Sequence, residues 1–188
     1  MNFEKTKWSE HIPLKNHLLL TLRPAEPKDA PQVLAYIEQA ASESENLTFG
    51  PGEFGISLEQ ERVFLQQAAE ALTSLYLLAE IEGEIVGVLT FSAEKRPRVQ
   101  HGGEFGMSVL RKYWNLGIGG QMLASLIAWA RQTRIIRKIN LRVHVDNLSA
   151  IHLYEKYGFV REGRRTREFY LHGQFIDVFL MGLPLDPD

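Results

Sequence analysis

Short runs of apolar residues alternate with stretches of helical spacing along most of this chain. Seven segments have the length and the β-branched or aromatic content typical of strands. They lie at residues 18–23, 75–81, 84–91, 105–110, 138–145, 159–171 and 175–183. Glu82-Gly83 and His172-Gly173 each separate two of these strands, so each pair is expected to form an antiparallel hairpin.

Four stretches with apolar residues three or four positions apart predict helices. They lie after residues 27–29, from Ser57 to about residue 72, from Gly117 to about residue 133, and over 147–157. Ser57 and Gln60 form a capping box, and Gly158 ends the last helix. The third helix is expected to bury one stripe in the core, formed by Ile118, Met122, Leu126 and Trp129 or Ala130.

The order of these elements predicts an α/β (α+β) fold, a mixed sheet of about seven strands with helices on both faces. The strand at 138–145 is reached through a helix from the strand at 105–110, so these two strands should be parallel. A length of 188 residues, 45% of them hydrophobic, suits a single core. We expect one domain over 18–183, preceded by an arm at 1–17 and followed by a tail at 184–188.

Composition excludes several classes of function. A net charge of −2 and a pI near 6.3 argue against a nucleic-acid or anionic-membrane binder, so small-molecule or protein partners are expected. The chain has no cysteine, which excludes disulfides, thiolate metal sites and a covalent cysteine intermediate. The N-terminus lacks the apolar region of a signal peptide, and no run of about 18 apolar residues occurs. The expected location is the cytoplasm.

The junction Phe105–Gln121 has the clearest functional pattern. An apolar strand leads through a short basic and aromatic turn into Gly117-Ile118-Gly119-Gly120, which opens a helix. Free backbone N–H groups and the helix dipole at such a junction favour an anion, and glycine lets a diphosphate approach. The dinucleotide fingerprint and the P-loop do not fit, because Gln121 and Met122 stand where those motifs need other residues.

A second motif follows at Asn147–Val160, NLSAIHLYEKYGFV. With both motifs on the expected elements, the chain resembles the Gcn5-related N-acetyltransferases, the GNAT superfamily, over roughly residues 18–183. The resemblance implies a GNAT fold with splayed parallel central strands, acetyl-CoA as cosubstrate and no metal. It implies backbone contacts to pantetheine from Met107 and Val109, and a further contact from Asn147. It places the pyrophosphate at Trp114, Asn115, Leu116, Gly117, Ile118, Gly119 and Gly120.

Trp114 departs from the family pattern, which usually has Arg or Gln three residues before the first glycine. A side-chain contact to phosphate is therefore lost. Because backbone amides do most of the anion binding, affinity is expected to survive, with Arg111 or Lys112 supplying charge.

The resemblance assigns Tyr154 as the proton donor to the departing thiolate, and Tyr154 also as a contact to the cosubstrate. Its alternative role is a core aromatic residue. For the base we place Glu104 first, with His101 and His144 as competitors. Glu104 is either a buried glutamate with a raised pKa or an ordinary carboxylate that faces solvent. An alkylamine near pKa ~10 is also partly neutral without help, so a dedicated base is not essential.

These features predict an acetyl-CoA-dependent N-acetyltransferase that works by direct attack of a primary amine in a ternary complex. Four carboxylates in the region of the first two helices suggest a cationic acceptor, a small molecule or a protein amine: Glu38, Glu43, Glu45 and Glu53. The alternatives are a non-catalytic acyl-CoA sensor, a larger acyl group, or a hydroxyl acceptor. The sequence leaves open whether a homodimer forms.

Overall fold

One open, mixed β-sheet organises the molecule. The computed structural model describes residues 8–15 and 17–185. The eight strands lie in the order β1-β2-β3-β4-β5-β6-β8-β7. Their bounds are β1 Glu10–Pro13, β2 Leu19–Pro24, β3 Ser74–Ile81, β4 Glu84–Ala93, β5 Gly102–Val109, β6 Lys138–His144, β7 Val160–Leu171 and β8 Gln174–Pro184.

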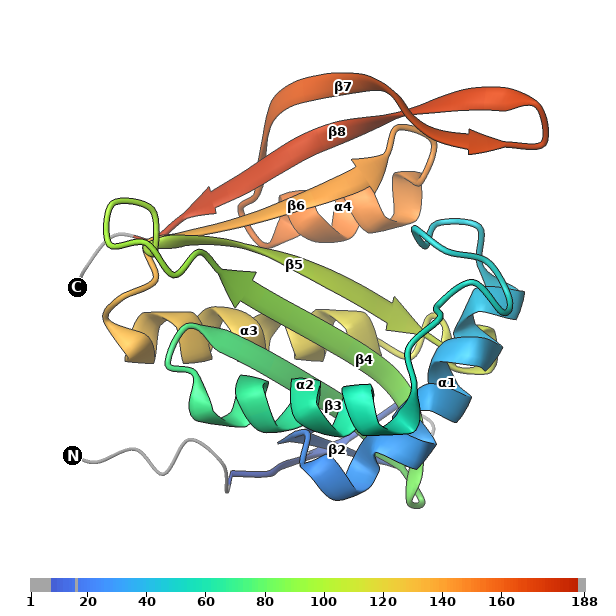
Figure 1. Cartoon of the computed structure of the whole chain (residues 1–188), viewed down its shortest axis with the longest axis vertical. Coiled ribbons are helices and arrows are strands. Elements are labelled where there is room, and N and C mark those ends of the chain that lie inside the picture. Colours follow the sequence, from blue (N-terminus) through green and yellow to red (C-terminus); the bar gives the residue numbers. More distant parts are fainter. Residues whose placement is uncertain (1–7, 16, 186–188) are drawn as a thin grey trace.

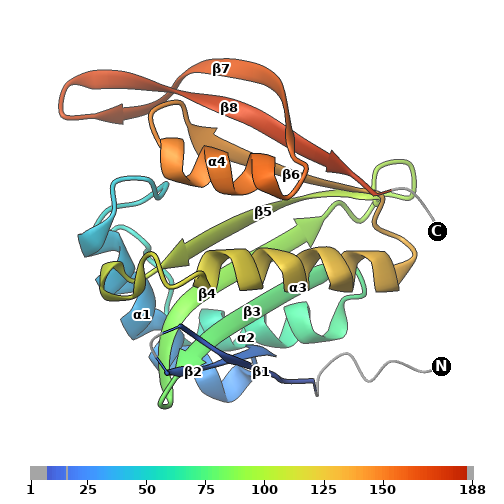
Figure 2. The same ribbon diagram turned by 180° about the vertical axis from the view of Figure 1, so that it is seen from behind.

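Helices cover both faces of this sheet, as predicted (Figure 1). Helices α1 (Ala30–Glu43) and α2 (Leu58–Glu70) lie on one face. Helices α3 (Ile118–Thr133) and α4 (Leu148–Lys156) lie on the other, as the reverse view shows (Figure 2). Two short 3-10 turns, η1 (Pro27–Asp29) and η2 (Arg111–Tyr113), precede α1 and α3. Among the described residues, no helix has the length and hydrophobicity needed to span a bilayer.

The sheet has eight strands rather than about seven, because part of the predicted N-terminal arm joins it. Strand β1 pairs antiparallel with β2, from Glu10 opposite Leu22 to Pro13 opposite Leu19. A strand of four residues carries too little alternation to be recognised in the sequence. The predictions for residues 1–7 and 186–188 lie outside the described residues.

Local sequence rules account for most element boundaries. The Ser57 and Gln60 side chains form the predicted capping box of α2. Glu82 and Gly83 have φ of 52° and 81°, which gives the tight turn between β3 and β4. The predicted stripe of α3 is confirmed, since Ile118, Met122 and Leu126 are fully enclosed in the core.

The two parallel strands at the centre separate soon after they begin. Strands β5 and β6 pair only from Gly102 opposite Lys138 to Glu104 opposite Asn140. Beyond these residues the strands diverge toward their carboxyl ends (Figure 1). The predicted parallel pair and its splay are therefore confirmed, and the backbone of β5 after Glu104 has no strand on its β6 side.

A buried ion-pair network ties β2 to β3 and η1. The Arg23 guanidinium donates to both oxygens of Asp29 at 2.7 and 3.0 Å, and it also donates to Glu80. Burial opposes the charge on Asp29, but hydrogen bonds from Arg23 and from the Glu26 amide outweigh burial and hold the pKa of Asp29 below its ordinary value. The network therefore stabilises the fold while Asp29 is ionised.

Replacing Arg23 with alanine should lower the free energy of unfolding at neutral pH by on the order of 2 kcal/mol, because Asp29 loses its partner while buried. The deficit should begin to shrink below about pH 4, where aspartate in the unfolded chain takes up a proton, and should vanish as the pH falls through the lower pKa of folded Asp29. Urea unfolding at pH 7 and pH 3 measures both effects. Arg62→Ala, which breaks an exposed pair with Glu59, is the control and should change little. Equal losses for the two variants would contradict this account.

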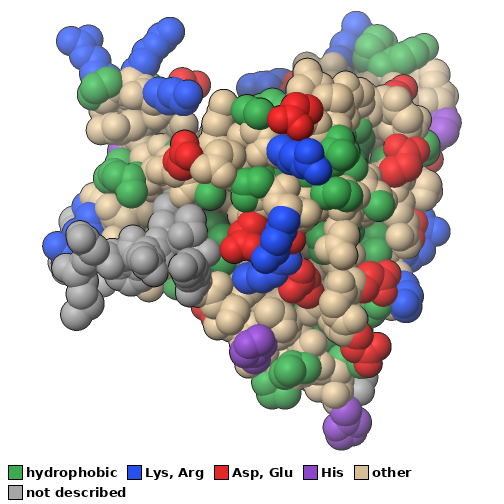
Figure 3. Space-filling model, turned by 60° about the horizontal axis from the view of Figure 1, so that its bottom comes forward, with side chains coloured by type: hydrophobic (Ala, Val, Ile, Leu, Met, Phe, Trp, Pro, Cys, Tyr) green, Lys and Arg blue, Asp and Glu red, His purple; other side chains and the backbone are tan. Residues whose placement is uncertain are grey.

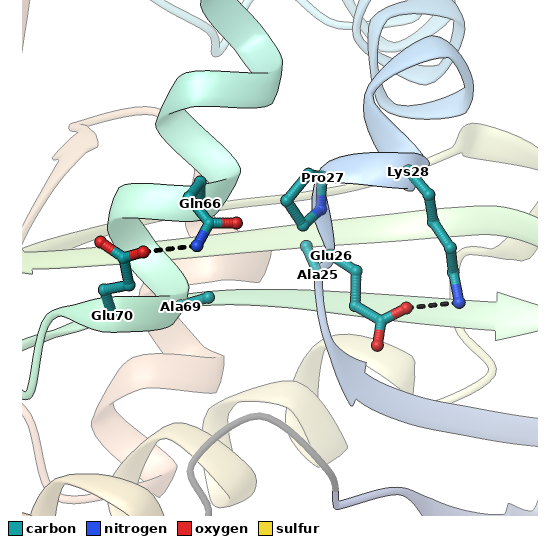
Figure 4. A pocket seen from close by; sticks show the side chains of 7 residues that line it. All are labelled: Ala25, Glu26, Pro27, Lys28, Gln66, Ala69 and Glu70. Atoms are coloured by element: carbon teal, nitrogen blue, oxygen red, sulfur yellow. Dashed lines mark hydrogen bonds and ion pairs between the residues drawn. The ribbon is translucent and has the colours of Figure 1, made fainter.

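On the face shown in Figure 3, the charged side chains of the described residues form no patch of a single sign. Figure 3 shows acidic and basic side chains interspersed there with apolar ones. A cavity of about 360 Å³ lies between η1 and α2, and Figure 4 shows Gln66 joined to Glu70 and Lys28 joined to Glu26 around it. No residue of β5, β6 or α4 lines this cavity, so it is separate from the candidate site.

Candidate active site

The turn that precedes α3 presents backbone N–H groups with no side-chain cap. Gly117 is the N-cap residue, with φ of 84°, and its carbonyl accepts the first helical hydrogen bond, from Gln121. Asn115 also has a positive φ, of 62°. Left-handed residues next to a helix start curve successive N–H groups toward one point and form an anion-binding concavity. The donors of this turn therefore fit a diphosphate.

The three glycines of the turn have different roles. A Cβ on Gly117 would meet no atom within 4 Å, so glycine is favoured here by the positive φ rather than by a lack of space. A Cβ on Gly119 would lie 3.4 Å from side-chain atoms of Leu153 and Met107, and one on Gly120 would lie 3.1 Å from the Tyr157 hydroxyl. Gly119 and Gly120 therefore also let α4 pack closely on α3, and the role of all three glycines in admitting phosphate stays a prediction.

The cationic residues of the turn are engaged elsewhere. The Arg111 amide donates to the Glu43 carboxylate at 2.6 Å, and the Arg111 guanidinium donates to the Glu43 carbonyl. The Lys112 ammonium lies 3.7 Å from the Glu84 carboxylate and 4.8 Å from the Tyr113 ring centre. The structure therefore gives both side chains partners away from the α3 N-terminus.

Trp114 makes a specific contact in place of the family's Arg or Gln. Its indole Nε1 donates to the Val109 carbonyl at 2.6 Å, and Arg111 lies over the ring at 5.6 Å from its centre. The ring is 46% exposed. Trp114 therefore folds back over the end of β5 and occupies a backbone acceptor there.

Alternate residues of β5 direct their backbone N–H and C=O groups into the gap where β5 and β6 separate. The Leu110 amide donates to the Val86 carbonyl on β4, and β4 and β5 keep one register from Gly87 opposite Val109 onward. Because successive residues of a strand direct their backbone groups to opposite sides, Met107 and Val109 direct theirs toward β6. Beyond Glu104 no β6 residue pairs with them. Met107 thus has both groups free of sheet pairing, whereas the Val109 carbonyl binds Trp114.

Helix α4 carries Tyr154 on the face that packs against β5. Tyr154 is 8% exposed, and its ring lies edge-on to Phe105 at 5.7 Å between centres. Burial raises the pKa of Tyr154 to about 12. Its hydroxyl has no hydrogen-bond partner within the described part of the chain, yet it is not among the fully enclosed polar atoms. The Tyr154 hydroxyl is therefore a free donor next to an opening.

Asn147 caps α4 as predicted. Its Oδ1 accepts a hydrogen bond from the Ala150 amide at 3.2 Å. Leu153 of α4 and Tyr157, the residue that follows α4, lie against the first turn of α3 beside Gly119 and Gly120. These contacts fix Tyr154 relative to the turn before α3.

Glu104 lies on the opposite face of the sheet from Tyr154. Residues 104, 106 and 108 of β5 share that face, and the Ser108 hydroxyl lies 2.8 Å from the Tyr36 hydroxyl of α1. The Glu104 side chain is 47% exposed and accepts from Arg142 Nε at 2.8 Å. Arg142 also binds Glu168 on β7 at 2.7 Å. Of the two descriptions considered for Glu104, the buried glutamate is wrong and the solvent-facing carboxylate fits.

The two competing histidines differ. His101 is exposed in the loop before β5, and its carbonyl accepts from the Arg137 and Lys138 amides. His144 at the end of β6 is 7% exposed, and its ring meets Phe169 of β7 at 4.2 Å between centres. Its Nε2 is fully enclosed with no hydrogen-bond partner, and burial lowers the pKa of His144. His144 is thus held as a neutral ring beneath Phe169.

An exposed strip crosses the central strands on the α1 and α2 side. Thr90 and Ser92 of β4 lie opposite Gly106 and Glu104 of β5, and all four are exposed although both strands are internal to the sheet. A cavity of about 540 Å³ adjoins this strip, lined by Ser92, Ala93, Glu94, Lys95, Arg96, Gly102, Gly103, Glu104 and Asn140. The strip therefore forms an accessible floor on the face opposite Tyr154.

The four carboxylates expected to attract a cationic acceptor have local structural partners. Glu38 accepts from the Gly52 amide, and Glu53 accepts from the Gly50 amide at 2.7 Å. Glu45 lies 2.8 Å from His172 at the tip of the β7–β8 hairpin, and Glu43 binds Arg111. Among the described residues, none of them forms a hydrogen bond or an ion pair with Glu104 or with its partner Arg142. These contacts order the loop at residues 44–57, and the acidic acceptor site stays a prediction.

Comparison with known proteins agrees with this geometry. The acetyltransferase (GNAT) family model matches residues 37–159. The L-amino acid N-acetyltransferase AaaT of Escherichia coli (strain K12) is 34% identical over 105 residues, which cover 56% of this chain and 65% of that enzyme. The match thus spans slightly less than two thirds of this curated relative.

Solved structures share the fold. The crystal structure of an acetyltransferase of the GNAT family from Streptococcus pneumoniae has a TM-score of 0.86 and 35% identity, covering 89% of this chain and 99% of that one. The structure of yncA from Salmonella typhimurium, determined with its cofactor acetyl-CoA, has a TM-score of 0.76 at 19% identity, covering 89% and 94%. The family match extends over well more than half of the chain, and the resemblance in its motifs is confirmed: this chain belongs to the acetyltransferase (GNAT) family.

Proposed function

We propose that this protein transfers an acetyl group from acetyl-CoA directly to a primary amine within a ternary complex. One observation carries the proposal: an uncapped helix N-terminus, a splayed pair of strands and a free buried tyrosine hydroxyl adjoin one another. Membership of the family supports acetyl-CoA as the donor. The name of the Escherichia coli relative supports an amine as the acceptor.

The turn before α3 and the free edge of β5 form the proposed site for acetyl-CoA. Backbone amides of residues 115–120 bind the pyrophosphate, and Met107 with the Val109 amide pairs with pantetheine, in place of a neighbouring strand. Trp114 and Asn147 border the same site. When bound there, acetyl-CoA supplies an activated thioester and a thiolate leaving group.

Tyr154 acts on the leaving sulfur as a hydrogen-bond donor. Its pKa of about 12 keeps the hydroxyl protonated at neutral pH. A free thiol has a reference pKa near ~8.5, so complete proton transfer to a thiolate would cost roughly 5 kcal/mol. Donating a hydrogen bond as charge develops avoids most of this cost. The hydroxyl is suited to that role because no other group in the described structure uses it.

The amine approaches from the exposed strip on the other face of the sheet. Glu104 lies at this strip, and Arg142 fixes the orientation of its carboxylate. We therefore propose Glu104 as the group that takes a proton from the amine, either directly or through water. His144 is enclosed beneath Phe169, and this favours Glu104 over His144.

Replacing Glu104 with glutamine should lower kcat/KM for the amine about 10²-fold at pH 7, within the range typical of general bases. The loss should become smaller near pH 9, because alkylamines with pKa near ~10 are then increasingly neutral without a base. Steady-state kinetics at both pH values measure this change. A loss of the same size at pH 7 and pH 9 would instead assign Glu104 to holding Arg142 in place.

The function itself is tested by following CoA thiol release from acetyl-CoA with and without a panel of primary amines. The proposal predicts release that depends on the amine and saturates with it. A protein that binds acetyl-CoA but releases no CoA with any amine would be a binding or sensor domain.

A further inference from the structure

Helix α2 buries a carboxylate that has no cation. Glu61 is 2% exposed on the side of α2 that faces the sheet. Its Oε1 accepts one hydrogen bond, from the Tyr76 hydroxyl of β3 at 3.1 Å. No other hydrogen bond and no ion pair reaches this carboxylate within residues 8–15 and 17–185. Burial raises the pKa of Glu61.

This arrangement differs from that of Asp29, which is the other buried acid among the described residues. Asp29 is 4% exposed, and it has both a guanidinium and a backbone amide as partners. A buried carboxylate without a positive partner is costly, and acids whose ionisation is perturbed by burial are enriched at functional sites. Glu61 has the Tyr76 hydroxyl alone, and its remaining lone pairs are free to accept hydrogen bonds.

Strand register places this pair beside the exposed strip. Tyr76 on β3 lies opposite Thr90 on β4, and Thr90 lies opposite Gly106 on β5. Thr90 and Gly106 belong to the accessible floor, and a Cβ on Gly106 would have only the Thr90 hydroxyl near it, at 3.8 Å. Figure 1 shows α2 crossing the same face of the sheet at β3. Glu61 and Tyr76 therefore stand at the α2 border of the floor.

The chemistry of the carboxylate suits one class of ligand. An ammonium group carries three N–H donors and a full positive charge, which match an ionised carboxylate with free lone pairs. Anions and apolar groups would leave the charge of Glu61 unpaired. Burial strengthens the attraction to a cation because water screens it little there.

We propose that Glu61 binds a second ammonium group of the acceptor, other than the amine that attacks the thioester beside Glu104, at the α2 border of the floor. This inference rests on the proposed function, because it assumes that an amine occupies the floor. It assigns the protein to acceptors that carry a second cationic group, with a carboxylate different from the four expected in the loop region. Glu61 is a binding residue in this proposal, and no proton transfer is assigned to it.

The test compares amine binding and turnover in wild type, Glu61→Gln and Glu59→Gln. Glu59 is the matched control, since it lies in the same first turn of α2 with a side chain that is 78% exposed. The probes are spermidine, tyramine, L-methionine and an alanyl peptide amide at pH 7. Binding of each amine is measured by calorimetry in the presence of CoA, and turnover by CoA release. Thermal unfolding of each variant is recorded without ligand.

We expect Glu61→Gln to weaken binding of spermidine, which has ammonium groups besides the reacting one, and to raise its KM, at least tenfold. Tyramine, which has a single amine, should bind within twofold of wild type, and Glu59→Gln should stay within twofold of wild type for both. Glutamine keeps an acceptor for Tyr76 and removes a costly buried charge, so the unfolding temperature of Glu61→Gln should equal or exceed that of wild type. A lower affinity without lower stability would be the signature of a ligand site. If Glu61→Gln does not fold, Glu61→Met, of similar length, replaces it.

Unchanged spermidine affinity in a folded Glu61 variant would overturn the inference, as would equal losses in Glu59→Gln. Failure of the wild type to bind any of the four probes would also overturn it. Amine binding that depends on Glu61, without CoA release from wild type, would uphold the site and contradict the proposed transferase activity instead.

Discussion

Replacing Tyr154 with phenylalanine should lower kcat by about 10²-fold or more while the dissociation constant for acetyl-CoA stays close to that of wild type. The aromatic ring, with its edge-on contact to Phe105, remains, and only the free hydroxyl is removed. Stabilisation of the leaving sulfur is needed only as charge develops, so the loss should fall on turnover rather than on binding.

Tyr157→Phe is the matched control for this experiment. Tyr157 lies one turn further along the chain, where its hydroxyl is close to Gly120 of α3. Steady-state kinetics and calorimetry with acetyl-CoA should separate the two variants, with Tyr157→Phe keeping most of its activity. Full kcat in Tyr154→Phe would make Tyr154 a core residue and remove it from the mechanism.

Replacing Gly117 with aspartate should weaken CoA binding by about 10²-fold or more, whereas Gly117→Asn should bind nearly as wild type. Asparagine and aspartate have the same shape, and both tolerate a positive φ better than other side chains do. A Cβ at this position meets no neighbouring atom, so either side chain fits. Like charges about 4 Å apart repel by roughly 4 kcal/mol at an effective dielectric constant of 20, and exposure reduces this.

Calorimetry with CoA at low and high salt measures the comparison. The difference between the two variants should narrow at high salt, because screening weakens repulsion between exposed charges. Equal affinities for Gly117→Asp and Gly117→Asn would place the pyrophosphate away from this turn.

Most of the fold could be predicted from the sequence, because residues a few positions apart determine where its helices and turns begin and end. The capping box at Ser57, the turn at Glu82-Gly83 and the N-cap at Asn147 depend on residues a few positions apart. The parallel pair followed from a helical crossover. Strand β1 was not predicted, because a strand of four residues is too short to show the alternation of apolar and polar residues that marks a strand.

The hydrogen bonds and ion pairs of side chains could not be predicted from the sequence, since they join residues far apart in the chain. Glu43 pairs with Arg111, and Glu104 with Arg142, and neither partner is marked by any local pattern. The local partners of the four loop carboxylates could not be foreseen for this reason. Glu61 carried one usable signal, because it lies four positions before the fully buried Leu65 and so shares the inward stripe of α2.

The glycine turn illustrates the same limit within one motif. Its position at a strand-to-helix junction was predicted from the sequence. Gly117 provides a positive φ, whereas Gly119 and Gly120 allow close packing. This difference depends on the position of α4, which only the three-dimensional structure gives.

The most direct test of the central claim follows the acetyl group itself. The protein is incubated with acetyl-CoA labelled in the acetyl carbon and with an amine that stimulates CoA release, and the products are separated. Direct transfer predicts that the label appears in the N-acetylated amine in an amount equal to the CoA released, and that without amine no label remains on the precipitated protein. Label that stays in acetyl-CoA, is released only as acetate, or is bound covalently to the protein would contradict the proposed reaction.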